Sequence, residues 1–258
     1  MRIPRIYDAA MPDEAGATLQ LDDFGASHVS RVLRLKTGDQ IRLFDGKGNE
    51  YLSELSLTGK KTEAVLREKL SVNVESPIKV ELLQVISRGD RMEFTLQKAV
   101  ELGISRIIPL TSERCGVKLD ADRAAKKVES WQRIAIAACE QCGRNVVPVV
   151  EPLQSLASFV SSHQAAAAAG DDSASCPVDD QGFINITLDP GAQRRLTNLP
   201  QCGRYRLLIG PEGGFTADEV ELARNGGFTG VSLGPRILRT ETAALVCMSI
   251  LGCTMGDL

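Results

Sequence analysis

The sequence predicts an α/β protein in two parts: a small β-rich domain, a barrel in outline, and then a domain built on a parallel sheet. A hairpin signature, Asp45-Gly46-Lys47-Gly48-Asn49, lies between two strand-like segments near the N-terminus. From about Pro77 onward, apolar segments of strand length alternate with helical ones, which is the order that builds a parallel sheet. Two glycine-containing loops follow strands near the C-terminus. We therefore predict domains at residues 1–76 and 77–258.

The composition of the 258-residue chain is that of an ordinary globular protein, with 43% hydrophobic and 24% charged residues. The net charge is −3, so a nucleic-acid partner would need a local basic surface. No apolar run approaches the ~18 residues of a membrane span, and the N-terminus lacks a signal-peptide core. We expect a cytoplasmic protein without membrane contact.

The seven cysteines are scattered and odd in number, which predicts free thiols rather than a disulfide framework. Cys139-Glu140-Gln141-Cys142 has C-x-x-C spacing, but neither a second pair nor paired histidines accompany it. It also lies in a helical pattern. A redox or zinc site is therefore disfavoured.

In the first domain, we expect a short helix capped by Ser27 that runs to Leu33, a turn at 36–39, and three strands: Gln40–Phe44, Glu50–Leu57 and Glu63–Arg67. Basic residues punctuate the domain, but Asp and Glu balance them, so composition alone indicates an ordinary solvated surface.

In the second domain, the near-continuous apolar segments predict buried parallel strands at Lys79–Ile86, Ile104–Leu110, Val146–Val150, Arg204–Ile209 and Phe228–Leu233. Helices are expected at Asp90–Leu102, Ala121–Cys142 and Glu241–Leu251, and from a capping box formed by Thr216 and Glu219 up to Gly226-Gly227. The segment at about 161–181 is rich in Ala, Ser and Asp and lacks an apolar period, so we interpret it as a flexible surface insertion.

The two glycine loops are Gly210-Pro211-Glu212-Gly213-Gly214 and the segment from Gly234 to Arg239. Either could be only a tight turn, but the pair follows two strands that we expect to be adjacent, at the edge where open α/β sheets bind ligands. The first loop is neither G-x-G-x-x-G nor a P-loop. Because Glu212 would repel phosphate, the pair indicates an uncharged or cationic ligand.

The first loop, together with Leu233-Gly234-Pro235-Arg236-Ile237-Leu238-Arg239-Thr240-Glu241-Thr242-Ala243, resembles the RsmE family. These are 16S ribosomal RNA (uracil-N3) methyltransferases of the SPOUT class, which bind S-adenosyl-L-methionine. The resemblance implies a trefoil-knotted domain, a rare exception to unthreaded chains. It also implies cofactor-binding residues, namely Leu110, Thr111, Ile209, Gly210, Pro211, Glu212, Gly213, Leu233, Gly234, Ile237, Leu238 and Thr242.

The start of the chain, MRIPRIY, and the segment His28–Arg34 resemble the PUA-like RNA-binding domain of the same family. The resemblance implies RNA contacts by Arg2, Arg5, Arg31 and Arg34, a substrate in 16S rRNA of the 30S subunit at the uridine numbered 1498, and a homodimer. The apolar last helix could supply part of the dimer interface or simply be core. One departure stands out: the family's G-R-N-R-V-P has Val146 in place of its second arginine here.

Methylation at N3 of uracil requires loss of the N3 proton, and a nearby guanidinium would lower the pKa of that nitrogen. Candidate catalytic residues are Arg144, Arg239 and Glu241, with Arg236, Glu140 and Glu212 as alternatives. No metal is needed, because the methyl group of the cofactor is already activated. The rival hypotheses are a non-catalytic RNA-binding assembly factor, which would not need the glycine loops, and a nucleotide-dependent oxidoreductase, which lacks its fingerprint.

Overall fold

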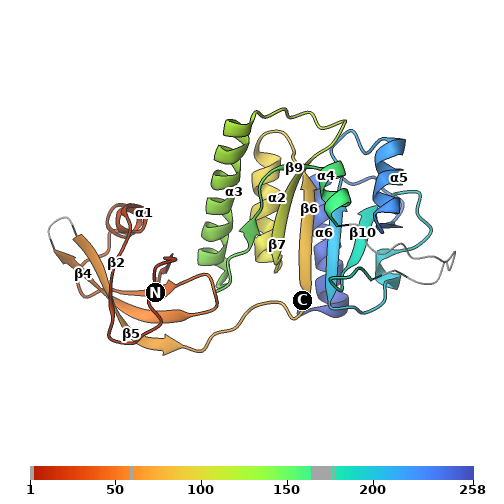
Figure 1. The fold of residues 1–258 in the computed structure, drawn as a ribbon. Coiled ribbons are helices and arrows are strands. Elements are labelled where there is room, and N and C mark those ends of the chain that lie inside the picture. Colours follow the sequence, from red (N-terminus) through yellow and green to blue (C-terminus); the bar gives the residue numbers. More distant parts are fainter. Residues whose placement is uncertain (1–2, 59–60, 164–175, 177) are drawn as a thin grey trace. The chain divides into compact units, whose positions relative to one another are not determined.

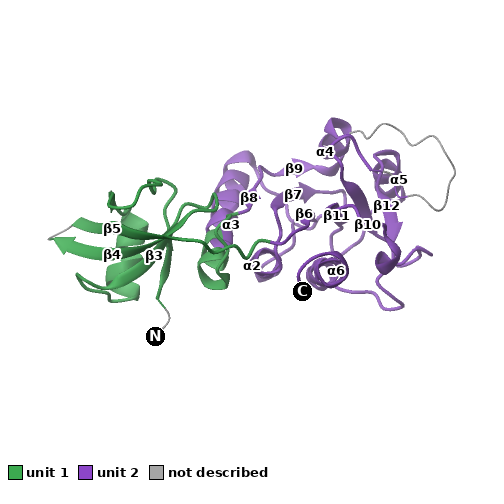
Figure 2. Cartoon of the chain, turned by 90° about the horizontal axis from the view of Figure 1, so that it is seen from below, with its two compact units in different colours: residues 1–75, 136–147 green, residues 76–135, 148–258 purple. Residues whose placement is uncertain are grey.

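The computed structural model describes residues 3–58, 61–163, 176 and 178–258 (Figure 1). The chain forms two compact units, which Figure 2 colours separately. The first comprises residues 1–75 and 136–147, and the second comprises residues 76–135 and 148–258. The sequence did not predict that residues 136–147 belong with the first unit. In the part of the chain that the structure describes, no helix is long and apolar enough to cross a membrane.

The first unit contains a five-stranded mixed sheet in the order β1-β3-β4-β5-β2. Its strands are β1 (Arg5–Tyr7), β2 (Thr18–Gln20), β3 (Gln40–Phe44), β4 (Glu50–Thr58) and β5 (Lys61–Leu70). The predicted hairpin is confirmed, since β3 and β4 pair antiparallel. Its turn is held by the Asp45 carboxylate, which accepts hydrogen bonds from the backbone of Lys47 at 2.7 Å and of Asn49 at 3.1 Å.

The first helix of this unit differs from the prediction. Helix α1 (Asp23–Ser27) is capped by Asp22, whose side chain accepts from Gly25 N at 2.6 Å. A π-helical turn, η1 (His28–Val32), continues it. Ser27 cannot be the N-cap because its own backbone is already α-helical, and a capping residue needs an extended backbone.

The second unit is built on a seven-stranded sheet in the order β12-β10-β11-β6-β7-β8, with β9 also paired to β7. All of its ladders are parallel. The strands are β6 (Lys79–Val85), β7 (Arg106–Thr111), β8 (Val149–Val150), β9 (Gln154–Ser155), β10 (Ile184–Leu188), β11 (Arg204–Ile209) and β12 (Thr229–Val231). The parallel-sheet prediction is confirmed, whereas the predicted knot stays a prediction.

Helices cover both faces of this sheet (Figure 2). One face carries α2 (Asp90–Glu101) and α6 (Thr240–Met255), and the other carries α4 (Leu156–Ser162) and α5 (Ala217–Asn225). The remaining helices are α3 (Ala121–Cys142) and the 3-10 turn η2 (Leu196–Asn198). Side chains alternate between the faces, so Leu83 and Val85 of β6 join the core under α4, whereas Gln84 points toward α6. The Thr216–Glu219 capping box that begins α5 is confirmed.

Three details of the second unit correct the sequence interpretation. Strand β10, second from one edge of the sheet, was not predicted, and it lies between β11 and β12, so the strands before the two glycine loops are not adjacent. The strand expected at Val146–Val150 is reduced to β8, because Val146 instead bridges to Lys47. Most of the proposed insertion lies outside the described residues, but Asp179 is buried and holds Arg206 at 2.6 Å.

Candidate functional site

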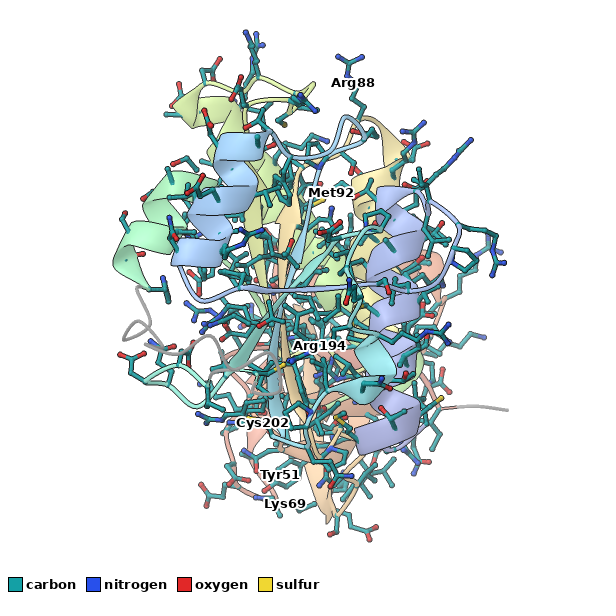
Figure 3. All side chains as sticks on the ribbon, turned by 90° about the vertical axis from the view of Figure 1, so that its right-hand side faces the viewer. Tyr51, Lys69, Arg88, Met92, Arg194 and Cys202 are labelled. Atoms are coloured by element: carbon teal, nitrogen blue, oxygen red, sulfur yellow. The ribbon has the colours of Figure 1, made fainter. Side chains whose placement is uncertain are left out.

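The strands β6, β7 and β11 are neighbours in register, and all three end at the same edge of the sheet. Leu83, Gln84 and Val85 pair in turn with β7, and Gln84 also pairs with Ile209. The loop after β11 (residues 210–216) and the loop before α6 (residues 233–239) both start at this edge, because all the strands are parallel. Arg88, after β6, and Cys202, before β11, mark the two opposite ends of the unit in Figure 3.

The first glycine loop is hydrogen-bonded to the start of α6. The Thr240 hydroxyl donates to the carbonyl of Gly210 at 2.8 Å and accepts from the Gln84 side-chain amide at 2.9 Å. A Cβ on Gly210 would lie 3.1 Å from the Phe215 ring, so a larger residue is disfavoured there. These contacts fix where the loop leaves the sheet.

The other side of the same loop is held by residues that follow β7. Arg114 donates to the Gly213 carbonyl at 3.2 Å, and the backbone of Glu113 donates to the Glu219 carboxylate at 2.7 Å. Glu212 pairs with Arg91 at 3.0 Å. Because this ion pair balances the Glu212 charge, Glu212 repels a phosphate less than its sequence position alone indicates.

The structure brings most of the predicted cofactor residues to this edge. Leu110 and Thr111 end β7, Ile209 ends β11, and Gly210–Gly213 and Leu233–Leu238 belong to the two loops, while Thr242 lies in the first turn of α6. Ile237 stands out because its side chain is 86% exposed. Sequence reasoning missed Gln84 and Thr240. A glutamine inside an apolar strand was the signal that could have indicated the first of them.

Buried polar atoms without partners gather at this edge. In the described part of the chain, five buried side-chain N or O atoms have no hydrogen-bond partner, and four of them are Gln84 Oε1, Ser87 Oγ, Ser112 Oγ and Glu241 Oε2. Ser87 follows β6, Ser112 follows β7, and Glu241 lies in the first turn of α6. Because buried polar groups are normally paired, such a group of atoms is what a bound polar ligand would complete.

The predicted catalytic residues fall in different units. Arg239 is exposed and immediately precedes α6, with Glu241 two residues later. Arg144 belongs to the first unit, where it is 5% exposed and its guanidinium donates twice to the Glu75 carboxylate, at 2.7 and 2.9 Å. The alternative base Glu140 also lies there and accepts from the backbone of Tyr7 at 3.0 Å. Burial raises the pKa of Glu140, and the Tyr7 hydrogen bond partly offsets this.

The structure places the four arginines of the predicted RNA contacts in different surroundings. Arg2 lies outside the described residues, while Arg31 and Arg34 are exposed. The prediction for Arg5 is wrong: its side chain is buried and paired with Glu50 at 2.9 Å. It also donates to the Cys139 carbonyl at 2.6 Å and to the Asn145 side chain. The guanidinium of Arg5 is therefore engaged inside the protein and is not available to bind a phosphate.

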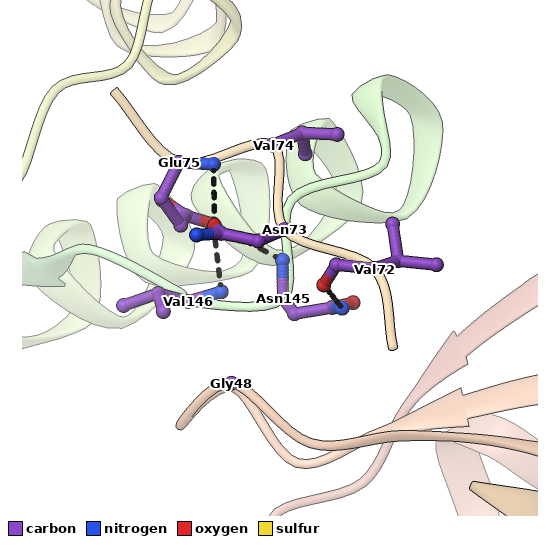
Figure 4. A pocket seen from close by; sticks show the side chains of 7 residues that line it. All are labelled: Gly48, Val72, Asn73, Val74, Glu75, Asn145 and Val146. Carbon is purple, nitrogen blue, oxygen red and sulfur yellow. Dashed lines mark hydrogen bonds between the residues drawn. The ribbon is translucent and has the colours of Figure 1, made fainter. Parts of the chain in front are cut away.

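The first unit has a surface cavity (Figure 4), whereas the glycine loops belong to the second unit. The cavity is lined by Gly48, Val72, Asn73, Val74, Glu75, Asn145 and Val146. Its polar groups are already joined to one another, since the Glu75 carboxylate accepts from the backbone of Asn145 at 3.2 Å and of Val146 at 3.1 Å. It offers no residue that the predicted chemistry uses.

The cysteines give no sign of redox or zinc chemistry. All seven are described and free of disulfides, as the sequence predicts. Burial raises the pKa of the Cys139 thiol to about 12. Because the thiolate is the reactive and metal-binding form, the C-x-x-C pair is poorly suited to either role.

Comparisons with known proteins point in one direction. A family model described as an RNA methyltransferase domain matches residues 74–252, and one described as an RNA methyltransferase PUA domain matches residues 21–66. The chain is 34% identical to the ribosomal RNA small subunit methyltransferase E of Buchnera aphidicola (subsp. Schizaphis graminum), over 100% of this chain and 98% of the relative. It is 36% identical to that of Bacillus subtilis, over 92% and 90%.

Two solved structures cover the whole of both chains. A methyltransferase of Legionella pneumophila in complex with the bound cofactor SAM has a TM-score of 0.88 and 38% identity. The ribosomal RNA small subunit methyltransferase E of Neisseria gonorrhoeae, bound to S-adenosyl methionine, has a TM-score of 0.86 and 37% identity. The similarity therefore extends over both units of the chain.

Proposed function

Because the chain belongs to the RsmE family of ribosomal RNA small subunit methyltransferases, we propose that it methylates N3 of a uridine in 16S rRNA. The methyl donor is S-adenosyl-L-methionine, which supplies an activated methyl group and so requires no metal. The proposed target is the uridine numbered 1498 in the 30S subunit. We further propose that the enzyme is a cytoplasmic homodimer.

One observation carries the cofactor assignment: both glycine loops, the ends of β6 and β7, and a group of partnerless buried polar atoms meet at one edge of the second unit. S-adenosyl-L-methionine carries an ammonium group, a carboxylate, ribose hydroxyls and an adenine. Such a ligand offers donors to Gln84 Oε1, and both donors and acceptors to the two serine hydroxyls. The residues present therefore fit the cofactor.

For the chemistry, we propose that Arg239 and Glu241 act at the reacting base. Arg239 is exposed at the start of α6, so its guanidinium is available to stabilise the negative charge that develops on the uracil ring. Glu241, a residue of the first helical turn, has an unpaired buried carboxylate oxygen that could accept the N3 proton. The uracil must be unpaired or flipped out, since pairing would occupy N3.

Arg144 is less suited to the same task than the sequence indicated. Its guanidinium is buried and already engaged with Glu75, so we propose that it shapes the loop at Gly143–Asn145. The two roles are separable by experiment. A catalytic Arg144 predicts that high pH partly rescues Arg144→Ala, because more uracil is then ionised without help from the enzyme. A shaping role predicts lower stability and no such rescue.

We propose that the first unit anchors RNA through the exposed surface of α1 and η1. Arg31 and Arg34 supply positive charge there, and two apolar side chains on the same segment are strongly exposed, Phe24 at 66% and Val32 at 68%. Exposed aromatic rings beside basic residues are the groups on which unpaired bases stack. For the homodimer, Val246 and Ile250 of α6 remain partly exposed, whereas Ala243, Ala244, Cys247 and Leu251 are core.

The decisive experiment compares methylation of 30S particles with that of naked 16S rRNA, followed by mapping of the modified nucleotide. We expect one modified uridine, at position 1498, with the methyl group on N3. Modification at another nucleotide would remove the target assignment but keep the enzyme class. Arg239→Ala should lose turnover while retaining cofactor binding, which a calorimetric titration with S-adenosyl-L-methionine measures.

A further inference from the structure

Gln84, Thr240 and Gly210 form a buried chain of hydrogen bonds that the proposed reaction does not itself use. Gln84 is fully buried and Thr240 is 6% exposed. The Gln84 amide donates to Thr240 Oγ1 at 2.9 Å, and Thr240 Oγ1 lies 2.8 Å from the carbonyl oxygen of Gly210. Each residue comes from a different element: β6, the start of α6, and the loop after β11.

The chain can run in only one direction. The Gln84 Nε2 group also donates to the carbonyl of Val85 at 3.0 Å, so two acceptors fix the orientation of the amide. A hydroxyl has a single proton, and the Gly210 carbonyl can only accept. The Thr240 proton therefore points at Gly210, while its lone pair faces Gln84. Exchanging the positions of Oε1 and Nε2 in the Gln84 amide would not give the unpaired Oε1 a partner. Oε1 would then face the carbonyl oxygen of Val85, and both atoms are acceptors.

This chain joins the two loops to each other and to the sheet. Gly210 is the first residue of one loop, and Thr240 directly follows the last residue of the other. Gln84 lies between β7 and β11 in the middle of the sheet, paired with Pro109 on one side and Ile209 on the other. The position of one loop relative to the other is thus set from a rigid strand through two hydrogen bonds.

We infer that Thr240 and Gln84 are positioning residues that hold the two glycine loops at the separation needed to bind S-adenosyl-L-methionine. The inference rests on the proposed function, since the ligand of the loops is the methyl donor. Preformed sites bind more tightly because less ordering is left to do on binding. Loss of the chain should therefore weaken cofactor affinity more than it weakens the fold.

Thr240→Val is the central variant, because valine keeps the size and branching of threonine but neither donates nor accepts. Thr240→Ser restores the hydroxyl. The matched control is Thr95→Val: Thr95 is also buried, and its hydroxyl donates to the backbone carbonyl of Arg91 within α2 at 2.9 Å, whereas Arg91 contacts Glu212 of the first glycine loop through its side chain. Both valine variants leave a buried carbonyl with one partner fewer, and Thr240→Val also leaves the Gln84 amide with one acceptor fewer. The thermal stability of Thr240→Val should therefore fall somewhat more than that of Thr95→Val.

The measurement is the dissociation constant of S-adenosyl-L-methionine by calorimetry, well below the unfolding temperature, with steady-state kinetics on 30S particles. We expect Thr240→Val to weaken binding at least tenfold and to raise KM for the cofactor without raising KM for RNA. Thr240→Ser should stay within about threefold of the unmodified protein, and Thr95→Val within about twofold.

Thr240→Val with cofactor affinity within twofold of the unmodified protein would overturn the inference, as would equal losses in Thr240→Val and Thr95→Val. Either result would leave the hydrogen-bond chain a feature of stability alone. A failure of the proposed function looks different: the unmodified protein itself would then bind no S-adenosyl-L-methionine.

Discussion

Two groups of buried polar side chains, one in each unit, contrast in how they are satisfied. In the first unit, Arg5 has the carboxylate of Glu50, two backbone carbonyls and the side chain of Asn145 as partners. Arg144 has Glu75. At the sheet edge of the second unit, by contrast, Ser87, Ser112 and Glu241 each keep a buried oxygen without a partner.

With the proposed function, the difference separates charged residues that build the protein from polar residues that we propose bind the cofactor. A buried charge that has all its partners has nothing left for RNA, and removing one of those partners destabilises the unit because the other charge stays buried alone. A buried oxygen without a partner is costly, so it persists where binding repays the cost. The second unit also contains a satisfied group, Arg206 with Glu81 at 2.8 Å and Asp179 at 2.6 Å. Burial alone would raise the pKa of Asp179, but hydrogen bonds from the Phe183 backbone and the Asn185 side chain, with the charge of Arg206, lower it.

The largest effect should come from Arg5→Ala, which leaves the carboxylate of Glu50 buried without its cation. We expect the free energy of unfolding of the first unit to fall by ~3–5 kcal/mol, the usual result of removing one partner of a buried pair. Chemical denaturation followed by circular dichroism measures this. Arg31→Ala, at an exposed position, should change stability by less than ~0.5 kcal/mol. If Arg5→Ala kept its stability and lost only RNA affinity, the contrast between the two groups would fail.

Next in size is Gly213→Val. A Cβ at Gly213 would lie 3.3 Å from Cβ of Arg114, so the branched side chain must push that residue or the loop aside. We expect at least a tenfold loss of affinity for S-adenosyl-L-methionine with little change in thermal stability. Gly213→Ala should give a smaller loss of the same kind, because only one carbon is added. Equal affinity in all three proteins would move the cofactor site away from this loop.

A smaller effect is expected for the double variant Arg31→Ala/Arg34→Ala. If each guanidinium contacts one phosphate, the slope of log affinity against log salt should become shallower by about 1.4, at about 0.7 for each contact on single-stranded RNA. Filter binding at several salt concentrations measures the slope. Arg67→Ala is the control, because Arg67 is exposed but pairs with Glu54 at 2.9 Å. An unchanged slope would show that this surface is not the RNA anchor.

The smallest effect concerns pH and Cys139. Its thiol pKa is raised from 9.0 to about 12 by burial, so the folded protein keeps a proton that the unfolded chain releases near pH 9. The stabilising contribution is therefore complete below pH 9 and is lost as the pH rises toward 12. Urea unfolding at pH 8, 9 and 10 should show a decline that is shallower in Cys139→Ala. Substitution of the exposed Cys253 should leave the decline unchanged.

Much of the second unit could be predicted because its strands are buried on both faces and read as continuous apolar segments, as Arg204–Ile209 does. Strand β10 was missed because the polar residue Asn185 interrupts its apolar pattern. The side chains that pair with Asn185 were not apparent, since Asp179 lies in the proposed insertion and Arg206 is 21 residues away in the sequence. That strand also separates β11 from β12, and so the adjacency of the loop-bearing strands was predicted wrongly.

The candidate site shows the same limit. Glycines and their loops were visible in the sequence because a turn beside a ligand needs them, as the positive φ of Gly214 and Gly234 shows. Whether an arginine faces solvent or a buried carboxylate depends on contacts between residues far apart in the chain. Arg5 and Glu50 are 45 residues apart, and no local pattern joins them. Gln84 and Thr240 are separated by 156 residues.

The membership of residues 136–147 in the first unit has a consequence for biosynthesis. While the chain is being translated, residues 1–75 emerge long before the Cys139 carbonyl and Asn145 that Arg5 requires. The amino-terminal sheet can pair its strands early, but the buried arginine stays without several of its partners until residue 145 has left the exit tunnel. All of β6, α2, β7 and α3 must be synthesised in the meantime. The first unit therefore cannot complete its folding before part of the second unit has been made, and a nascent fragment that ends at residue 75 should be more sensitive to protease than the same segment within the finished protein.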